Sequence, residues 1–214
     1  MIIIGARGFA KELLQVIEEN GELTPELCFF DNINDDLPKK LYGRFRLIRS
    51  FDELGIFFRQ ERNEFVLGIG NPLIRQKLCL KAISIGGSLS SIISKSSSIG
   101  QYGTNFGLGL CVMQNTIIEN DVIIGDGCLI HNSSMISHDT SLGEFCEISP
   151  GAKLLGRTEV GNLSHIGSNA VILPGINIGN NVRVGAGSVV TKDIPDNITV
   201  VGIPAKDIKH PKTK

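Results

Sequence analysis

Aliphatic residues recur at every sixth position through the second half of the chain. The run is unbroken and consists of Val112, Ile118, Ile124, Ile130, Ile136, Leu142, Ile148, Leu154, Val160, Ile166, Ile172, Ile178, Val184 and Val190. A period of six fits neither an α-helix, which repeats every ~3.6 residues, nor a two-sided strand. It fits a β-helix of hexapeptides, in which every sixth side chain points into a shared core. Three hexapeptides close one triangular coil, so residues eighteen apart lie one above the other.

A second set of small or aliphatic residues stands two positions before these, and we expect it to fill a narrower part of the interior. Its members are Thr116, Val122, Cys128, Ser134, Thr140, Cys146, Ala152, Thr158, Ser164, Ala170, Ile176, Val182 and Ser188. Glycine often follows the core aliphatic residue, as in Gly125 and Gly161, and we expect it to adopt backbone angles that cost other residues energy. No coil buries its own core, so stability comes from stacking.

Residues 1–86 show a different pattern, in which short apolar segments alternate with amphipathic ones. Strands are predicted over Met1–Ile4, Leu27–Phe30, Arg44–Ile48 and Phe65–Ile69, and helices after the turn Gly5–Gly8, over Phe51–Arg62 and from Pro72 to about Ile85. The alternation predicts a small α/β domain with a Rossmann-like parallel sheet. We therefore expect three parts: an α/β domain over 1–86, a parallel β-helix over 87–192, and a polar tail over 193–214. A one-residue slip of the period at Gln101–Asn105 indicates a bulge at a corner.

Composition excludes several classes of partner. The chain has 214 residues and a net charge of −1, so nothing indicates general binding to nucleic acid or to an anionic membrane. No apolar run approaches the ~20 residues of a membrane span, and no basic region precedes the short apolar start, so we expect neither membrane insertion nor a signal peptide. Cys128 and Cys146 should stack as reduced core fillers. These features predict a cytoplasmic protein.

Three turns of the first domain lie where parallel strands end. They are Gly5–Gly8, the segment at Asp31, and Gly68–Asn71. Taken singly, each also fits a turn without a ligand: the first lacks the third glycine of the dinucleotide fingerprint, and an acidic loop residue is often merely solvated. Open α/β sheets bind ligands at the carboxyl ends of their strands, and helix starts attract anions. Together the turns predict a nucleotide-type ligand.

Of the four histidines, His138 has the best position for chemistry. It stands two places after the core residue Ile136, at an outward corner, and Asp139 follows it. A histidine beside a carboxylate suits general-base work near neutral pH, although a solvated surface histidine fits the same pattern. His131 and His165 occupy different places in the hexapeptide, so we predict no metal site among these residues.

The chain resembles the bacterial hexapeptide-repeat acyltransferases that acetylate nucleotide-linked amino sugars, together with their sialic-acid O-acetyltransferase relatives. The resemblance covers nearly the whole chain and rests on GARGFAKELL, CFFDN, GIGNPLIR, the hexapeptides, SHDTSLGEFCEISPGAKLLG and VVGIPAK. It implies a left-handed β-helix, a homotrimer with active sites between adjacent β-helices, acetyl-CoA as co-substrate, and no metal.

The resemblance also implies roles for individual residues. His138 matches the catalytic base, Asp139 the acidic neighbour that orients it, and Gly156 the backbone donor to the thioester oxygen. Positions matching acetyl-CoA contacts are Glu147, Gly156, Ser168 and Ala186. Positions matching nucleotide-sugar contacts are Arg7, Gly8, Phe9, Asp31, Asn32 and Gly70.

Four positions depart from the pattern of these relatives. Glu147 and Phe9 stand where histidine is common, Asn32 replaces an aspartate, and His131 replaces an asparagine. These differences do not change the predicted reaction class, but they leave the identity of the sugar undecided. The sequence predicts N-acetylation of a nucleotide-linked amino sugar, a UDP- or dTDP-4-amino-4,6-dideoxy sugar, for glycan biosynthesis. The alternatives are O-acetylation of the sialic-acid type and a non-catalytic β-helix scaffold that binds nucleotide sugars.

Overall fold

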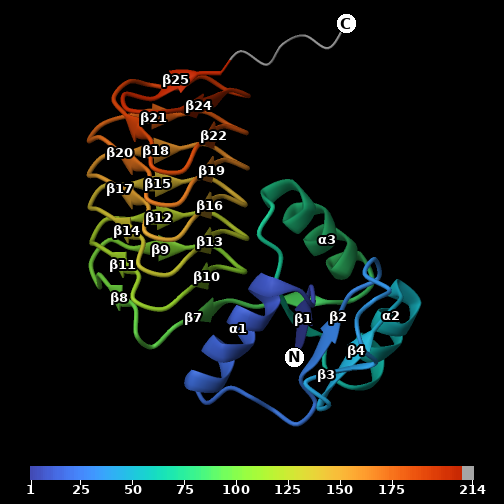
Figure 1. Cartoon of the computed structure of the whole chain (residues 1–214). Coiled ribbons are helices and arrows are strands. Elements are labelled where there is room, and N and C mark those ends of the chain that lie inside the picture. The colour runs from blue at the N-terminus through green and yellow to red at the C-terminus, as the bar shows by residue number, and fades with distance from the viewer. Residues whose placement is uncertain (209–214) are drawn as a thin grey trace, which may run out of the picture. The chain divides into compact units, whose positions relative to one another are not determined.

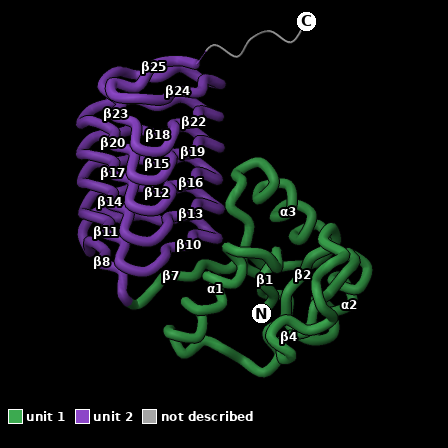
Figure 2. The backbone as a smooth tube through the Cα atoms, viewed as in Figure 1, with its two compact units in different colours: residues 1–95 green, residues 96–214 purple. Residues whose placement is uncertain are grey.

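The computed structural model describes residues 1–208, which fall into two compact units (Figure 2). The first unit is residues 1–95 and the second begins at residue 96. The boundary predicted from the sequence lies earlier, after residue 86. The difference arises because the segment after α3 first adds a strand to the sheet of the first unit before the hexapeptide stack begins.

The first unit is an α/β domain built on one sheet with the strand order β3-β4-β2-β1-β5-β6. Its strands are β1 Ile2–Ile4, β2 Cys28–Phe30, β3 Lys40–Leu41, β4 Phe45–Ile48, β5 Glu64–Leu67 and β6 Ser88–Leu89, with the short β7 Ile92–Ile93 after them. Its helices are α1 Gly8–Glu19, α2 Phe51–Gln60 and α3 Pro72–Ser84 (Figure 1). The predicted parallel sheet is confirmed. The hairpin of β3 with β4 is antiparallel and was not predicted, because two residues carry no readable period.

Helix ends in this unit follow ordinary capping chemistry. The Ser50 side chain accepts a hydrogen bond from the backbone N–H of Glu53 and starts α2. Asn71 does the same for Ile74, and Pro72 occupies the first turn of α3. The cap of α1, Arg7, makes no such side-chain bond. All three residues of β1 are buried, as expected of a central parallel strand.

The second unit is a left-handed parallel β-helix, as predicted. Its strands are β8 Ser98–Ile99, β9 Asn105–Phe106, β10 Cys111–Val112, β11 Ile117–Ile118, β12 Ile123–Ile124, β13 Leu129–Ile130, β14 Met135–Ile136, β15 Ser141–Leu142, β16 Glu147–Ile148, β17 Lys153–Leu154, β18 Glu159–Val160, β19 His165–Ile166, β20 Val171–Ile172, β21 Asn177–Ile178, β22 Arg183–Val184, β23 Val189–Val190, β24 Thr199–Val201 and β25 Lys206–Asp207. Successive coils pair in parallel at the eighteen-residue offset, as in Ile118 with Ile136 and Ile130 with Ile148. Figure 1 shows the coils stacked into a column with β25 at one end.

The six-residue pattern accounts for the interior of this column. Every aliphatic residue of the repeat from Val112 to Val190 is at most 3% exposed. The small residues two places earlier are also buried, except Ile176, which is partly exposed. The thiols of Cys128 and Cys146 lie in this interior and donate to the carbonyls of Gly143 and Gly161. The prediction that these cysteines are core fillers is confirmed.

The prediction about the repeat glycines is wrong about why glycine is needed. The left-handed backbone angles occur three places before the core aliphatic residue, with φ of 52–71°, and are carried by asparagine, aspartate and other residues as well as glycine. Gly125 and Gly161 do not have such angles. Glycine is needed there because the next coil lies close: a Cβ at Gly161 would come 2.6 Å from the carbonyl carbon of Gly179.

The stack continues past the end of the regular period. In β24, Val200 is 1% exposed and pairs with Val184, sixteen residues earlier instead of eighteen, and β25 folds back antiparallel on β24. The described part of the predicted tail over 193–214 therefore adds a shortened last coil, which a strict six-residue rule misses. His210 lies outside the described residues. Within residues 1–208 the structure contains no helix with the length and apolar character needed to cross a membrane.

Candidate functional site

His138 lies at an outward corner of the β-helix, two residues after β14. Its ring Nδ1 is 2.7 Å from a carboxylate oxygen of Asp139, and both side chains are about half exposed. A carboxylate only accepts hydrogen bonds, so Nδ1 is the donor in this contact, and in the neutral ring the lone pair then lies on Nε2. Asp139 has a φ of 57°, in the left-handed region, and its carboxylate contacts the ring of the residue before it. The pair has the arrangement of a general base with an orienting carboxylate.

Gly156 lies one coil above His138 and against its ring. A Cβ on Gly156 would come 2.6 Å from Cε1 and 2.7 Å from Nε2 of His138. The structure therefore brings together His138, Asp139 and Gly156, the three residues assigned to catalysis from the sequence. The ring edge with Cε1 and Nε2 thus lies next to Gly156, the residue expected to supply a hydrogen-bond donor.

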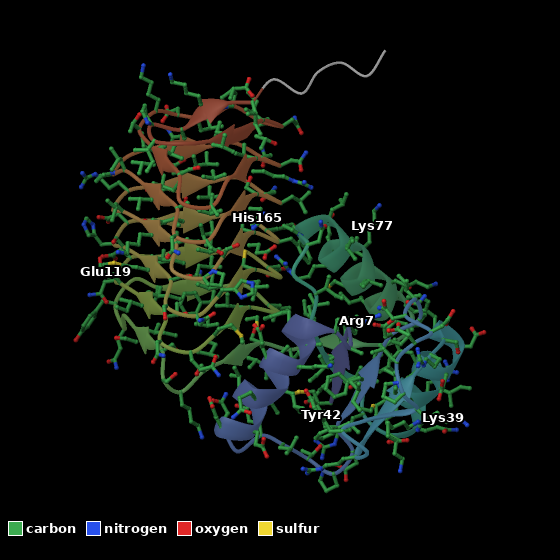
Figure 3. The ribbon with its side chains drawn as sticks, in the orientation of Figure 1. Arg7, Lys39, Tyr42, Lys77, Glu119 and His165 are labelled. Carbon is green, nitrogen blue, oxygen red and sulfur yellow. The ribbon has the colours of Figure 1, made fainter. Side chains whose placement is uncertain are left out.

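Glu119 was missed by the sequence analysis. Its carboxylate accepts a hydrogen bond of 2.9 Å from the backbone N–H of His138 and so anchors the corner that carries the base. Glu119 follows the core residue Ile118 one coil below, so the eighteen-residue offset could have indicated it. Figure 3 shows Glu119 and His165 on different sides of the β-helix.

Glu147, which was expected to contact acetyl-CoA, lies close to two histidines of its own chain. It begins β16, and its Oε1 lies 3.4 Å from Nε2 of His131 and 3.9 Å from Nε2 of His165. Its side chain is 12% exposed, and the Ser149 hydroxyl lies 2.8 Å from the same nitrogen of His165. The Ser149 hydroxyl and the Glu147 carboxylate both approach Nε2 of His165. A Ser-His-Glu triad needs one partner on each ring nitrogen, so these residues do not form one. Among residues 1–208, no group of three or more His, Cys, Asp and Glu side chains could hold a metal ion.

Ser168 and Ala186 lie at a different corner of the β-helix from His138. They lie one above the other, after β19 and β22, and the carbonyl of Ser168 accepts a hydrogen bond of 2.8 Å from the backbone N–H of Gly187. Ser168 is half-buried and Ala186 is exposed. Within one chain, the four residues expected to contact acetyl-CoA thus occupy separate parts of the β-helix: Gly156 stands beside His138, Glu147 on the sheet of β16, and Ser168 with Ala186 at another corner.

The first unit has a cavity of about 200 Å³ at the carboxyl ends of its central strands. Its lining includes Gly5, Phe30, Asp31, Asn32 and Ile69. The predicted residues Asp31 and Asn32 therefore lie together, and aliphatic and aromatic side chains form most of the wall. A flat, mostly apolar ring with a polar edge fits such a cavity.

The other predicted nucleotide-sugar residues do not line this cavity. Arg7 is exposed and forms an ion pair of 2.6 Å with Asp36. Gly8 is the exposed first residue of α1, and Phe9 is half-buried. The carbonyl of Gly70 accepts a hydrogen bond from a buried arginine of α3, Arg75.

Asp31 has a structural task in its own loop. One carboxylate oxygen accepts from the backbone N–H groups of Ile33, at 3.1 Å, and Asn34, at 2.9 Å. The other accepts from the Asn34 side chain at 2.8 Å. Asp31 is 8% exposed. Its carboxylate therefore shapes the loop beside the cavity, and any effect on a ligand passes at least partly through that loop.

Known proteins match both units. Residues 1–82 match the family model of the PglD N-terminal domain, and residues 121–156 and 157–192 match the bacterial transferase hexapeptide model of six repeats. No curated protein sequence matches the chain.

Solved structures of several proteins resemble nearly all of it. A variant of perosamine N-acetyltransferase from Caulobacter crescentus, in complex with CoA and GDP-perosamine, is 30% identical with a TM-score of 0.89, covering 98% of this chain and 96% of that one. The acetyltransferase domain of PglB from Neisseria gonorrhoeae, in complex with acetyl coenzyme A, is 29% identical with a TM-score of 0.88, covering 97% and 98%. WeeI from Acinetobacter baumannii is 27% identical with a TM-score of 0.87, covering 97% and 98%.

An α/β unit followed by a left-handed β-helix with a His–Asp corner defines an acyltransferase architecture. The chain belongs to the hexapeptide-repeat acyltransferases, in the group of nucleotide-sugar N-acetyltransferases.

Proposed function

We propose that the protein transfers the acetyl group of acetyl-CoA to the amine of a nucleotide-linked amino sugar, with His138 as general base. The observation that carries this is the corner geometry: Nε2 of His138 is available, Asp139 fixes the ring, and Gly156 lies against it. The similarity to enzymes solved with CoA, acetyl-CoA and GDP-perosamine supports the two substrates. We keep the 4-amino-4,6-dideoxy sugar, linked to UDP or dTDP, as the proposed acceptor class, and the cytoplasm as the proposed location.

The proposed reaction moves one proton from the sugar amine through His138 to the CoA sulfur. The sugar amine attacks the thioester carbonyl, a C–N bond forms, and Nε2 of His138 takes the amine proton while Asp139 stabilises the imidazolium. The backbone N–H of Gly156 donates to the oxyanion that develops on the carbonyl oxygen. When the C–S bond breaks, the CoA sulfur leaves as thiolate and receives the proton from His138.

The test is product analysis by mass spectrometry. Wild-type protein is incubated with acetyl-CoA and a panel of UDP-, dTDP- and GDP-linked amino sugars. We expect one class of sugar to gain an acetyl group that resists hydroxylamine, as an amide does. A hydroxylamine-labile product would instead support O-acetylation. Binding of a nucleotide sugar with no transfer to any member of the panel would favour the non-catalytic scaffold.

Replacing Asp139 by asparagine is expected to lower kcat by about 10–100-fold, because an amide cannot stabilise the imidazolium and can hold the wrong tautomer. Asparagine tolerates the left-handed backbone, so the fold should survive. Asp121 has the same φ of 57° at the equivalent corner one coil earlier, and it follows Asn120 instead of a histidine. Asp121→Asn is therefore the matched control. Steady-state kinetics that show equal losses in both variants would remove Asp139 from the mechanism.

We further propose a homotrimer, supported by one apolar face of the β-helix. On the sheet of β11, β14, β17, β20 and β23, six outward aliphatic side chains are exposed or partly exposed: Ile117, Met135, Leu155, Val171, Leu173 and Val189. The exposed Lys153 stands between Met135 and Val171 on the same face. His138 lies at the edge of this face, so a neighbouring copy there would enclose it. An exposed apolar surface with a charged residue within it is typical of protein interfaces.

Light scattering should give about three times 23.1 kDa for the wild type. Leu173→Glu should shift the mass toward the monomer and lower activity with it, since it places a charge on this face. Ile123 is 55% exposed on the neighbouring sheet, so Ile123→Glu is the control and should leave the trimer intact. An active wild-type monomer would contradict a site shared between copies.

A further inference from the structure

The loop of residues 31–37 forms one wall of the cavity in the first unit. It follows β2 and contributes Asp31, Asn32, Ile33 and Asn34 to the lining. A ligand bound there would meet this loop directly, so the conformation of the loop sets the shape of the site. The contacts that hold the loop in place therefore affect ligand binding. This inference rests on the proposed nucleotide-sugar function.

Arg49 is the clearest anchor of this loop from outside it. It comes directly after β4 and is half-buried. Its Nη1 donates to the carbonyl of Asn34 at 2.7 Å, and its Nη2 donates to the carbonyl of Leu37 at 2.5 Å. The planar guanidinium thus bridges two carbonyls of the loop with two separate nitrogens. A lysine ammonium is a single point and cannot reproduce this fork.

Asn34 connects that anchor to the mouth of the cavity. Its backbone N–H and its side-chain amide both donate to Asp31. Its side-chain oxygen accepts a hydrogen bond of 3.1 Å from Nη2 of Arg7, the same nitrogen that pairs with Asp36. Arg49 holds Asn34 through its carbonyl, and Asn34 in turn helps to hold Arg7, which stands at the N-terminus of α1.

We propose that Arg49 is a positioning residue for the nucleoside diphosphate part of the substrate. It fixes loop 31–37 as a preformed wall, and through Asn34 it keeps the Arg7 cation next to the N-terminus of α1, where backbone N–H groups favour an anion. Arg49 itself does not line the cavity. Its loss should therefore change the affinity for the nucleotide and leave the chemical step alone, because a loop that must order on binding lowers affinity.

The variants are Arg49→Met, which keeps the aliphatic stem, and Arg49→Lys, which keeps the charge. Arg59→Met is the control, since Arg59 is an exposed arginine of α2 that does not line this cavity. Titration calorimetry with UDP, dTDP and GDP gives Kd directly. We expect Arg49→Met to weaken the preferred nucleotide about tenfold and to raise the KM of its sugar by a similar factor, with Arg49→Lys in between. kcat and the KM for acetyl-CoA should stay within about twofold.

Hydrogen exchange supplies the readout that a general loss of stability would not mimic. The amides of Ile33, Asn34 and Leu37 should exchange faster in Arg49→Met without ligand and regain protection with nucleotide, while amides of β1 stay protected. An unchanged Kd, or a fall in kcat equal to the rise in KM, would overturn the assignment. If the wild type binds a nucleotide but acetylates no sugar, the proposed function fails and the role of Arg49 is still decided by Kd. If it binds none of the three nucleotides, both fail.

Discussion

Substitution of His138 by alanine is expected to lower kcat by about 10²–10⁴, the usual contribution of a general base. The ring has its Nδ1 bonded to Asp139 and its Nε2 next to Gly156, so it is the one group at this corner arranged to take a proton from an amine. The KM for acetyl-CoA should change little, because alanine leaves the backbone of the corner in place. The measurement is steady-state kinetics on the sugar identified by mass spectrometry.

Asn120 provides the matched control for this variant. It occupies the equivalent corner one coil earlier, and its side-chain oxygen accepts a hydrogen bond from the backbone N–H of Tyr102. Asn120→Ala should cost some stability and leave kcat near the wild-type value. If His138→Ala retained activity within a factor of two of wild type, the base would have to be sought elsewhere.

The hexapeptide half could be predicted almost completely because its signal is physical and local. Each inward side chain repeats the same environment, so residues such as Ile136 and Leu154 reveal both their burial and their place in the coil. The offset of eighteen then brings Gly156 above His138. The α/β unit was also predictable in outline, since buried strands and amphipathic helices differ in period.

The parts that the sequence did not reveal depend on side-chain conformation or on breaks in the period. The eighteen-residue offset places Glu119 one coil below His138, but it does not specify that the Glu119 side chain turns to the His138 backbone, nor that Glu147 turns toward His131 and His165. The last coil was not predicted because it is two residues shorter than the others. The hold of Arg49 on loop 31–37 links a strand end to an irregular segment, which has no period to read.

The second large effect is expected from adding a single methyl group at Gly156. Its backbone angles lie outside the left-handed region that favours glycine, so alanine is locally acceptable, yet the new Cβ would come 2.6–2.7 Å from two ring atoms of His138. Carbon atoms do not approach so closely, so the ring must turn away. A displacement of about 1 Å in a reacting group can cost about 10² in rate. Gly156→Ala should therefore lower kcat by roughly 10²-fold while the β-helix remains folded.

A double-mutant cycle separates this effect from a general disturbance of the coil. In His138→Ala, the ring that the methyl group would strike is gone, so adding Gly156→Ala should cost little further activity and little further stability. The two single variants should thus be strongly non-additive, with the double variant close to His138→Ala alone. Additive losses in kcat and in the free energy of unfolding would show that Gly156 acts independently of the ring. The cycle tests the contact itself, because only a shared contact between ring and backbone makes the cost of the methyl group depend on the histidine.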